Sequence, residues 1–336
     1  MKILNVLYQS NDYYAAVTGI SMVSLMKNNR DIDEINFFLL NDNISEVNLS
    51  KLQFICDENK RNLIIVETKK ILKKLRDELR VAPFKNTYTT YFKLLAVKSL
   101  YIPTDRVLQL DGDTIITGSL APLLDFDFDG NIMAATYNCG SHNSYKKMID
   151  IPLADKYYNC GVILFNQPLW IEQNCEEQII SHIKNVRNRY FTVDQDILNI
   201  LFRHKTKYLD ITYNFSSGFY VFGIKDSLYI YDLNEEYFDS YEIIKDAYDS
   251  PIIHHCLGAM TGKPWEKGNW HPQEALFDYY LERSPWKGYE KLKVNRGFIF
   301  KIQKVLYKFL PRRIYVIIHR YILIRYLEKM NREIQK

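Results

Sequence analysis

The chain has 336 residues, 47% of them hydrophobic, which is enough for one large or two small folded domains and excludes a disordered or fibrous protein. Its five cysteines include no Cys-x-x-Cys pair, which argues against a disulfide framework or zinc site and indicates a reducing, cytoplasmic compartment. The net charge of +4 is uneven: residues 296–336 carry +9 and residues 1–295 carry −5, which predicts a polyanionic partner for the tail, either nucleic acid or an anionic membrane surface.

Apolar stretches alternate with polar loops along the first 120 residues. The first stretch, residues 3–8, turns polar too soon for a signal peptide and is predicted to be a strand. Further strands are expected at 35–40, 63–66 and 106–110, and helices at 15–26, 47–56 with Ser45 as its cap, 71–79 and 91–101. This alternation predicts an α/β fold with a largely parallel sheet and helices on both faces.

The pattern is less regular beyond residue 120. Strands are expected at 132–136, 161–165 and 251–254, helices at 176–186 and 196–202, and residues 206–250 show too little periodicity to assign. No repeat or linker marks an internal boundary, and no apolar run reaches the roughly 20 residues needed to cross a bilayer. We therefore expect one catalytic-type domain at residues 1–290 and a basic tail at residues 291–336.

The most informative stretch is the strand 106–110 with the Asp-x-Asp that follows it, Asp111-Gly112-Asp113. Bound Mg²⁺ or Mn²⁺ usually takes one or two protein carboxylates together with phosphate oxygens of its substrate. In open α/β sheets, ligands bind in the crevice beyond the carboxyl ends of the strands. The pair is therefore a candidate clamp for a metal-bound diphosphate.

Other polar segments follow the expected strands. The loop after the first strand offers side chains that can hydrogen-bond or stack on a base, namely Tyr8, Ser10, Asn11, Asp12 and Tyr13. Lys93 supplies a cation upstream of the carboxylates, and Asn159 precedes Gly161, where the backbone can approach a ligand closely. Taken singly, these segments also fit a polar loop, a solvated charge and a simple turn.

Two later segments carry further candidate groups. Helix capping explains Asp194 and Asp196 at the start of one helix but leaves Gln195 between them unexplained. His254 at a strand end can ligate Mn²⁺, with His255 as the competing ligand, and Lys263 can neutralise a diphosphate. A pair of histidines is also common in purely structural settings.

Taken together and in this order, the segments resemble the retaining glycosyltransferases of family 8, over residues 1–290. The most specific parts of the resemblance are Leu110-Asp111-Gly112-Asp113, Asn159-Cys160-Gly161-Val162, Asp194-Gln195-Asp196 and Lys263-Pro264-Trp265. The resemblance implies a GT-A-type, Rossmann-like domain that moves galactose or glucose from a UDP-hexose, with retention and with Mn²⁺ or Mg²⁺. A saccharide or lipid-linked acceptor of the cell envelope would receive the sugar.

The resemblance also implies roles for individual residues. Asp111, Asp113 and His254 would hold the metal. The loop of Tyr8, Ser10, Asn11, Asp12 and Tyr13 would bind uridine, Gly112 would lie against the nucleotide, and Lys93 and Lys263 would contact ribose or diphosphate. Asn159, Asp194 and Gln195 would line the sugar and acceptor pocket.

Retention by double displacement requires a carboxylate nucleophile on the opposite face of the sugar, and the sequence nominates none. We therefore expect front-face transfer, in which Gln195 and Asp194 position the sugar while the metal and a lysine stabilise the leaving diphosphate. Two alternatives are a haloacid-dehalogenase-like phosphatase, in which Thr or Val would stand where this chain has Ile115, and a non-catalytic UDP-sugar-binding protein at the membrane.

Apolar residues recur at helical spacing in the tail, among lysines at 301, 304 and 308, and residues 314–324 continue apolar after Pro311. Basic amphipathic helices of this kind lie on anionic membrane surfaces. We therefore expect a cytoplasmic protein, peripheral on the membrane and without a nucleic-acid partner. The alternative is a pair of helices packed on the catalytic domain with a solvated basic face.

Overall fold

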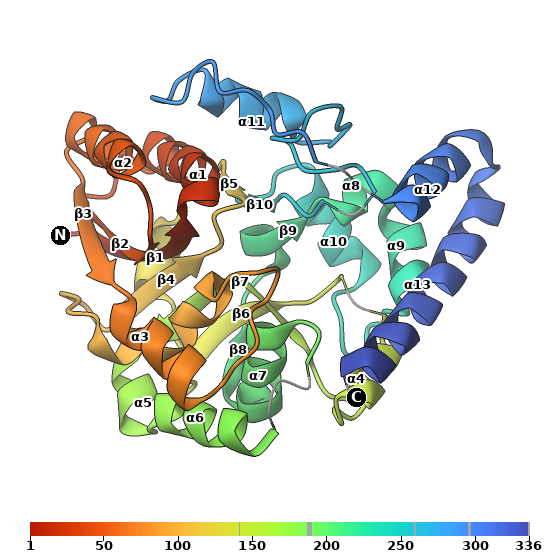
Figure 1. The fold of residues 1–336 in the computed structure, drawn as a ribbon, viewed down its shortest axis with the longest axis horizontal. Helices are drawn as coiled ribbons and strands as arrows, with labels where there is room; N and C mark the ends of the chain where they lie inside the picture. Colours follow the sequence, from red (N-terminus) through yellow and green to blue (C-terminus); the bar gives the residue numbers. More distant parts are fainter. Residues whose placement is uncertain (141, 187–189, 259, 295–296, 335–336) are drawn as a thin grey trace.

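The computed structural model describes residues 1–140, 142–186, 190–258, 260–294 and 297–334, built around a twisted seven-stranded sheet (Figure 1). The strand order is β3-β2-β1-β4-β7-β6-β8, with bounds β1 Ile3–Asn11, β2 Glu34–Asp42, β3 Asn62–Glu67, β4 Arg106–Leu110, β6 Met133–Tyr137, β7 Tyr158–Asn166 and β8 Thr206–Tyr208. Strands β1 to β4 pair in parallel, whereas β7 is antiparallel to both β4 and β6. The sheet is thus mixed, and the expectation of parallel pairing holds for its N-terminal half.

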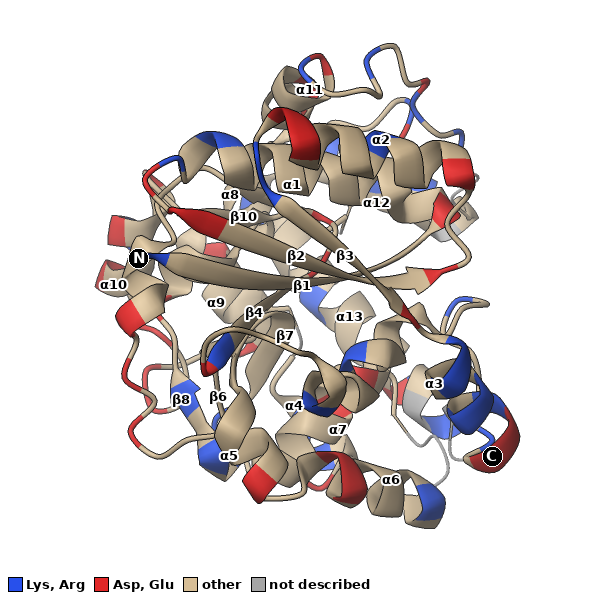
Figure 2. Cartoon of the chain, turned by 90° about the vertical axis from the view of Figure 1, so that its left-hand side faces the viewer, with Lys and Arg blue, Asp and Glu red and all other residues tan. Residues whose placement is uncertain are grey.

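Helices cover both faces of this sheet, as the alternating sequence pattern predicts (Figure 2). Helices α1 (Ala15–Asn28) and α2 (Glu46–Glu58) lie on one face, and α5 (Gln167–Glu172), α6 (Cys175–Val186) and α7 (Val193–Phe202) on the other. The Ser45 hydroxyl accepts a hydrogen bond from the Asn48 backbone N–H, which confirms the predicted cap of α2. Each face buries its own apolar cluster.

Short or irregular elements replace two of the predicted helices. Helix α3 (Lys69–Lys73) continues into a π-helical turn at Lys74–Glu78, and residues 91–101 form two 3₁₀ segments, Thr89–Leu95 and Val97–Ser99. In the first of these segments, residues 91–95 are all buried, so it lies within the core instead of along its surface. Short 3₁₀ segments of this kind are frequent as connectors between longer elements.

A second, three-stranded sheet brings distant parts of the chain together. Its order is β5 (Thr114–Ile116), β10 (Ile253–His255) and β9 (Phe215–Ser216), and its register sets His255 opposite Thr114. The unassigned stretch 206–250 contains α8 (Gly218–Phe222), α9 (Ile224–Tyr231) and α10 (Tyr241–Tyr248). This small sheet therefore places the histidine pair beside the Asp-x-Asp.

The C-terminal helices close one side of the molecule (Figure 1). After α11 (Glu274–Leu281), α12 (Phe298–Phe309) leads into α13 (Arg312–Ile334), which packs along α9 and reaches α4 (Ser144–Met148). Tyr315, Val316 and Leu327 are buried against the body. Other tail side chains are exposed, namely Phe298, Ile302, Val305, Phe309, Ile314, Ile317 and Tyr321. Within the described ranges, no helix combines the length and apolar character that crossing a bilayer requires.

Candidate active site

Two carboxylates and an imidazole meet where β4 ends. Ligand atoms of Asp111, Asp113 and His255 all lie within 4.8 Å of one another. The Asp111 backbone N–H donates to the Gly161 carbonyl at 2.8 Å, which ties the loop to β7. A Cβ at Gly112 would lie 2.5 Å from Thr18 Oγ1, so a glycine between the two aspartates lets the loop pack against α1. The two carboxylates suit Mn²⁺ or Mg²⁺, and the imidazole favours Mn²⁺ over the harder Mg²⁺, which takes oxygen ligands.

The structure places His255 in this group, where the sequence led us to expect His254. Neighbouring residues of a strand point to opposite sides, and His255 Nε2 lies 3.4 Å from Asp113 Oδ1. The His254 ring stacks on Tyr220 instead, and burial lowers its pKa to about 4. The expectation that His254 is the metal ligand is therefore corrected, because its side chain points away from the two aspartates.

Lys263, which is 150 residues from Asp113 along the sequence, also contacts this group. Its Nζ lies 2.5 Å from Asp113 Oδ2 and donates to the Cys256 carbonyl at 2.7 Å. The approach is close because Gly258 has no side chain: an added Cβ would lie 3.0 Å from the Lys263 stem. Burial by itself raises the pKa of Asp113, but Lys263 and His255 outweigh it and hold that pKa well below its usual range.

Lys93 lies beneath the cleft, away from its surface. It is 1% exposed, and its Nζ lies 2.9 Å from Asp194 Oδ2, 3.4 Å from Asp111 Oδ1 and 2.7 Å from the Cys160 carbonyl. Its ammonium group is therefore bound by protein oxygens. This placement does not agree with the predicted contact between Lys93 and ribose or diphosphate. Lys93 instead links the Asp-x-Asp to the acidic start of α7.

Gln195 is held at both ends of its amide. Its Oε1 accepts from the Cys160 backbone N–H at 3.1 Å, and its Nε2 donates to the Tyr157 hydroxyl at 3.2 Å. Tyr157 in turn donates to the buried Asp196 at 2.6 Å. Beside it, Asp194 Oδ1 accepts from the Thr90 hydroxyl at 2.9 Å. The contacts of Thr90 and Tyr157 could not be predicted from the sequence, because the pattern around each residue does not differ from that of an ordinary polar residue.

The predicted segment from Tyr8 to Tyr13 spans the end of β1 and the turn after it, and only some of its residues reach the cleft. Ser10 and Asn11 line the cleft, but the Tyr8 side chain is fully buried and its hydroxyl lies 2.7 Å from Ser21 Oγ. Both faces of β1 are buried, so alternation along the strand does not distinguish Tyr8 from residues that line the cleft. Asp12 accepts hydrogen bonds from the Ser45 backbone and the Asn48 amide at the start of α2. Tyr8 and Asp12 therefore stabilise the fold at these positions.

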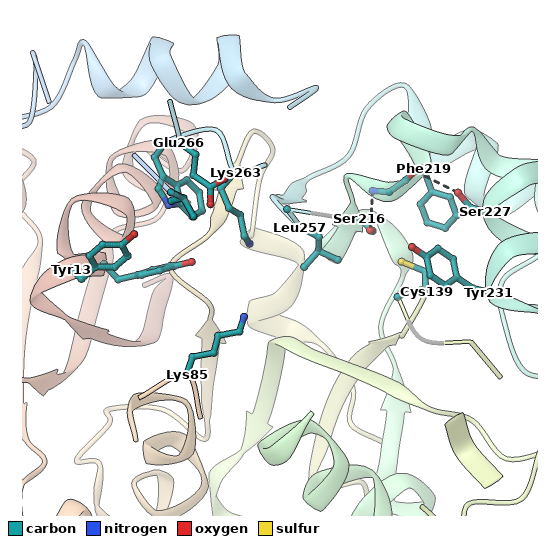
Figure 3. A pocket seen from close by; sticks show the side chains of 16 residues that line it. Tyr13, Lys85, Cys139, Ser216, Phe219, Ser227, Tyr231, Leu257, Lys263 and Glu266 are labelled. Atoms are coloured by element: carbon teal, nitrogen blue, oxygen red, sulfur yellow. Dashed lines mark hydrogen bonds between the residues drawn. The ribbon is translucent and has the colours of Figure 1, made fainter. Parts of the chain in front are cut away.

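Two adjoining cavities surround these groups. The first, of about 420 Å³, is lined by Ser10, Asn11, Asp111, Gly112, Asp113, Asn159, Asp194, Gln195, His255 and Lys263. The second, of about 690 Å³, shares Tyr14, Lys85, Leu257 and Lys263 with it. In Figure 3, Tyr13 and Lys263 lie on one side of the second cavity, and Cys139, Phe219 and Tyr231 lie across from them. A two-part substrate could occupy both spaces with its reacting bond near Lys263.

Comparison with known sequences agrees with this geometry. The sequence model described as "Glycosyl transferase family 8" matches residues 5–268. A lipopolysaccharide 1,2-glucosyltransferase of Escherichia coli K12 is 26% identical over 288 residues, which are 84% of this chain and 79% of that protein. A lipopolysaccharide 1,3-galactosyltransferase of Salmonella typhimurium LT2 is 31% identical over 206 residues, 60% of this chain and 56% of that protein.

Solved structures show the same fold. The galactosyltransferase LgtC, in complex with donor and acceptor sugar analogs, superposes with a TM-score of 0.69 at 22% identity, covering 86% of this chain and all of that one. The glycosyltransferase GlyE of Streptococcus pneumoniae TIGR4, in its apo form, gives a TM-score of 0.60 at 22% identity, covering 83% of this chain and 60% of that one. The predicted GT-A fold is confirmed by this likeness.

Proposed function

Because the chain belongs to glycosyltransferase family 8, we propose that it transfers galactose or glucose from a UDP-sugar, with retention, to a saccharide of the cell envelope such as lipopolysaccharide. The observation that carries the proposal is the group of Asp111, Asp113 and His255 on the wall of a cleft that also contains Lys263 and Gln195. Family membership also argues against the phosphatase and the non-catalytic binding protein.

The residues at the Asp-x-Asp fit a divalent cation. Two carboxylates and one imidazole supply three ligands, and the cleft beside them leaves the remaining positions to diphosphate oxygens and water. Bound there, Mn²⁺ or Mg²⁺ would act as a Lewis acid on the leaving diphosphate. Lys263, already 2.5 Å from Asp113, is within reach of the same leaving group.

The sugar would lie between the carboxylates and the start of α7. Asp194 is paired with the buried Lys93 and bonded by Thr90, so it is poorly disposed to attack a carbon as a nucleophile. We therefore propose front-face transfer. The acceptor oxygen bonds to the anomeric carbon as the bond to the UDP oxygen breaks on the same face, and the acceptor proton passes to that UDP oxygen. Trapping a covalent glycosyl-enzyme on Asp194 would overturn this mechanism.

The adjoining 690 Å³ cavity is a suitable place for the acceptor, because it opens beside Lys263 and combines aromatic rings with hydroxyls at Ser216, Ser227 and Tyr231. Aromatic faces and hydroxyls are common in sugar-binding pockets, since sugar rings carry both apolar faces and hydroxyl edges.

A lipid-linked acceptor would bring the enzyme to the cytoplasmic face of a membrane, and the tail suits that location. Exposed Phe298, Ile302, Val305 and Phe309 recur along one side of α12, beside exposed Lys301 and Lys308. The opposite side packs on the body, where the Tyr307 hydroxyl donates to the Val221 carbonyl. We propose residues 1–290 as the catalytic domain and 291–336 as a segment that lies on anionic lipid.

The catalytic proposal is tested by measuring UDP release from UDP-galactose, UDP-glucose and UDP-N-acetylglucosamine with Mn²⁺, with and without a chelator. We expect release from one of the hexose donors, loss with chelator and loss in Asp113→Ala, with Asp246→Asn on the exposed side of α10 as the control. No release from any donor would contradict the proposed activity, and release that survives chelation would contradict the metal.

The tail is tested by sedimentation with vesicles. We expect the full chain to bind phosphatidylglycerol-containing vesicles better than phosphatidylcholine vesicles. Binding should weaken in the double variant Phe298→Ser/Phe309→Ser and in Lys301→Glu/Lys308→Glu. The control Lys184→Glu/Lys245→Glu makes the same charge change at exposed sites on α6 and α10. Point variants suit this test because deleting the tail would uncover the core around Leu327. Equal binding by all variants would contradict the assignment.

A further inference from the structure

A chain of amide groups leads from the backbone of β7 to the ring of His255. The Gly161 backbone N–H donates to Asn159 at 2.9 Å, and a backbone nitrogen can only donate, so the atom facing it is the Asn159 oxygen. The Asn159 Nδ2 donates in the other direction, to Asn138 Oδ1 at 3.0 Å. The orientation of Asn159 is thereby fixed by the main chain.

The orientation of Asn159 in turn fixes that of the Asn214 amide. Asn214 Nδ2 donates to the same Asn159 oxygen at 2.8 Å, so Asn214 Oδ1 is the atom that faces His255 Nδ1, at 2.9 Å. An amide oxygen only accepts hydrogen bonds, and therefore Nδ1 of His255 carries a proton. In the neutral imidazole, Nε2 then keeps its lone pair.

That lone pair faces Asp113. Nε2 and Asp113 Oδ1 lie 3.4 Å apart, so two acceptors confront each other across a gap, which is favourable only with a cation or a proton between them. The ring is also held from its other side, because a Cβ on Gly161 would lie 2.3 Å from His255 Cε1. Asn214 itself is 5% exposed and directly precedes β9, which pairs with β10.

We propose that Asn214 is a positioning residue for the divalent cation: it holds His255 in the Nδ1–H tautomer, with Nε2 free to complete the ligand set of Asp111 and Asp113. The inference rests on the metal assignment in the proposed function. Partners that orient a metal-bound histidine typically contribute about 10- to 100-fold to metal affinity. Asn159, expected in the sugar pocket, acts here as the link that fixes the Asn214 amide.

The test combines Mn²⁺ titration calorimetry with ¹⁵N NMR of the histidine rings of the full chain. In the wild type we expect His255 as the Nδ1–H tautomer once the imidazole is neutral. Asn214→Ala should remove that preference and weaken Mn²⁺ binding about 10- to 100-fold. Asn138→Ala is the matched control. Asn138 is a similarly buried amide that also bonds to Asn159, and its removal leaves the contact between Asn214 and His255 intact.

The possible outcomes distinguish the role of Asn214 from the metal assignment on which it rests. Mn²⁺ binding by Asn214→Ala as tight as in the wild type, an equal loss in Asn138→Ala, or the Nε2–H tautomer in the wild type would each overturn the role of Asn214 while the metal site stands. A wild-type chain that binds no Mn²⁺ would overturn the metal assignment and this proposal with it. Thermal unfolding of each variant shows whether weakened binding reflects the site or a loss of folded protein.

Discussion

Lys93 Nζ lies 2.9 Å from Asp194 Oδ2 inside the protein, where its side chain is almost wholly buried. The same ammonium group reaches Asp111 at 3.4 Å, so one cation joins the metal-side carboxylates to the sugar-side carboxylate. Burial by itself lowers the pKa of Lys93, but Asp111 and Asp194 outweigh it and raise that pKa, which keeps the lysine charged. Any change in this charge should therefore affect both halves of the site.

Lys93→Met leaves the buried Asp194 and the partly exposed Asp111 without their cation. We expect the free energy of unfolding to fall by about 3–5 kcal/mol and UDP release to be lost, because breaking a buried ion pair leaves uncompensated charge. Lys93→Arg should retain more of both. Lys98→Met is the control: Lys98 pairs with Glu177 on the surface, so its loss should change the unfolding free energy far less. Equal urea midpoints for the Lys93→Met and wild-type chains would contradict this account.

The contrast between Lys93 and the Asp-x-Asp shows what the sequence could predict. An apolar strand followed by Asp111 and Asp113 specifies a strand end, and the structure places the pair there. The sequence around Lys93 gives no sign of burial, because its partners Asp111 and Asp194 are 18 and 101 residues away along the chain. Long-range pairing of charges leaves no periodic trace in the local sequence.

The sequence could not show which histidine faces the aspartates, nor assign the elements of residues 206–250, for related reasons. A three-residue strand is too short for alternation to show which of His254 and His255 faces the aspartates. The helices of the unassigned stretch, α8 to α10, have five to eight residues, too few for a helical period to emerge. Asn214 lies in that stretch, and its contact with His255 could therefore not be predicted from the sequence.

Tyr157→Phe should affect catalysis through Gln195. Removing the hydroxyl takes away the acceptor of Gln195 Nε2, so the amide loses one of its two tethers. We expect kcat to fall about 10- to 100-fold with little change in the KM for the UDP-sugar, because misplacement of a positioned group costs this much. Tyr145→Phe is the control, since Tyr145 also donates to Asp196 but Gln195 is not its partner. Equal kcat values in the two variants would place the effect at Asp196 and not at Gln195.

Gly112→Ala should disturb the Asp-x-Asp through α1. Its Cβ would lie 2.5 Å from Thr18 Oγ1, and overpacking of this kind costs about 1–3 kcal/mol and shifts the backbone. We expect UDP release to fall. The double variant Gly112→Ala/Thr18→Ala should recover much of it, because the clashing oxygen is gone and the remaining Thr18 contacts are at 3.4 Å or more. A double variant no more active than Gly112→Ala would show that the defect does not arise from this contact.

Asp239 provides a pH-dependent test of the fold outside the site. Burial raises its pKa to about 6, and the Tyr208 hydroxyl, at 2.5 Å from Oδ1, only partly opposes this effect. The folded chain thus binds this proton more tightly than the unfolded chain. Stability is therefore lost as the pH rises from about 4 to about 6, with a full effect of about 3 kcal/mol.

Asp239→Asn removes this titration and should stabilise the chain at pH 7 relative to the wild type, but make it about 1 kcal/mol less stable at pH 4, where the native carboxyl is already protonated. The gain should be about 1–2 kcal/mol, less than the full effect, because the new amide nitrogen takes the place of Oδ2, which accepts no hydrogen bond from the described residues. Urea unfolding at the two pH values measures the difference, with Asp246→Asn as the exposed control. A gain that is the same at both pH values would show that relief of packing, and not the carboxyl proton, is responsible.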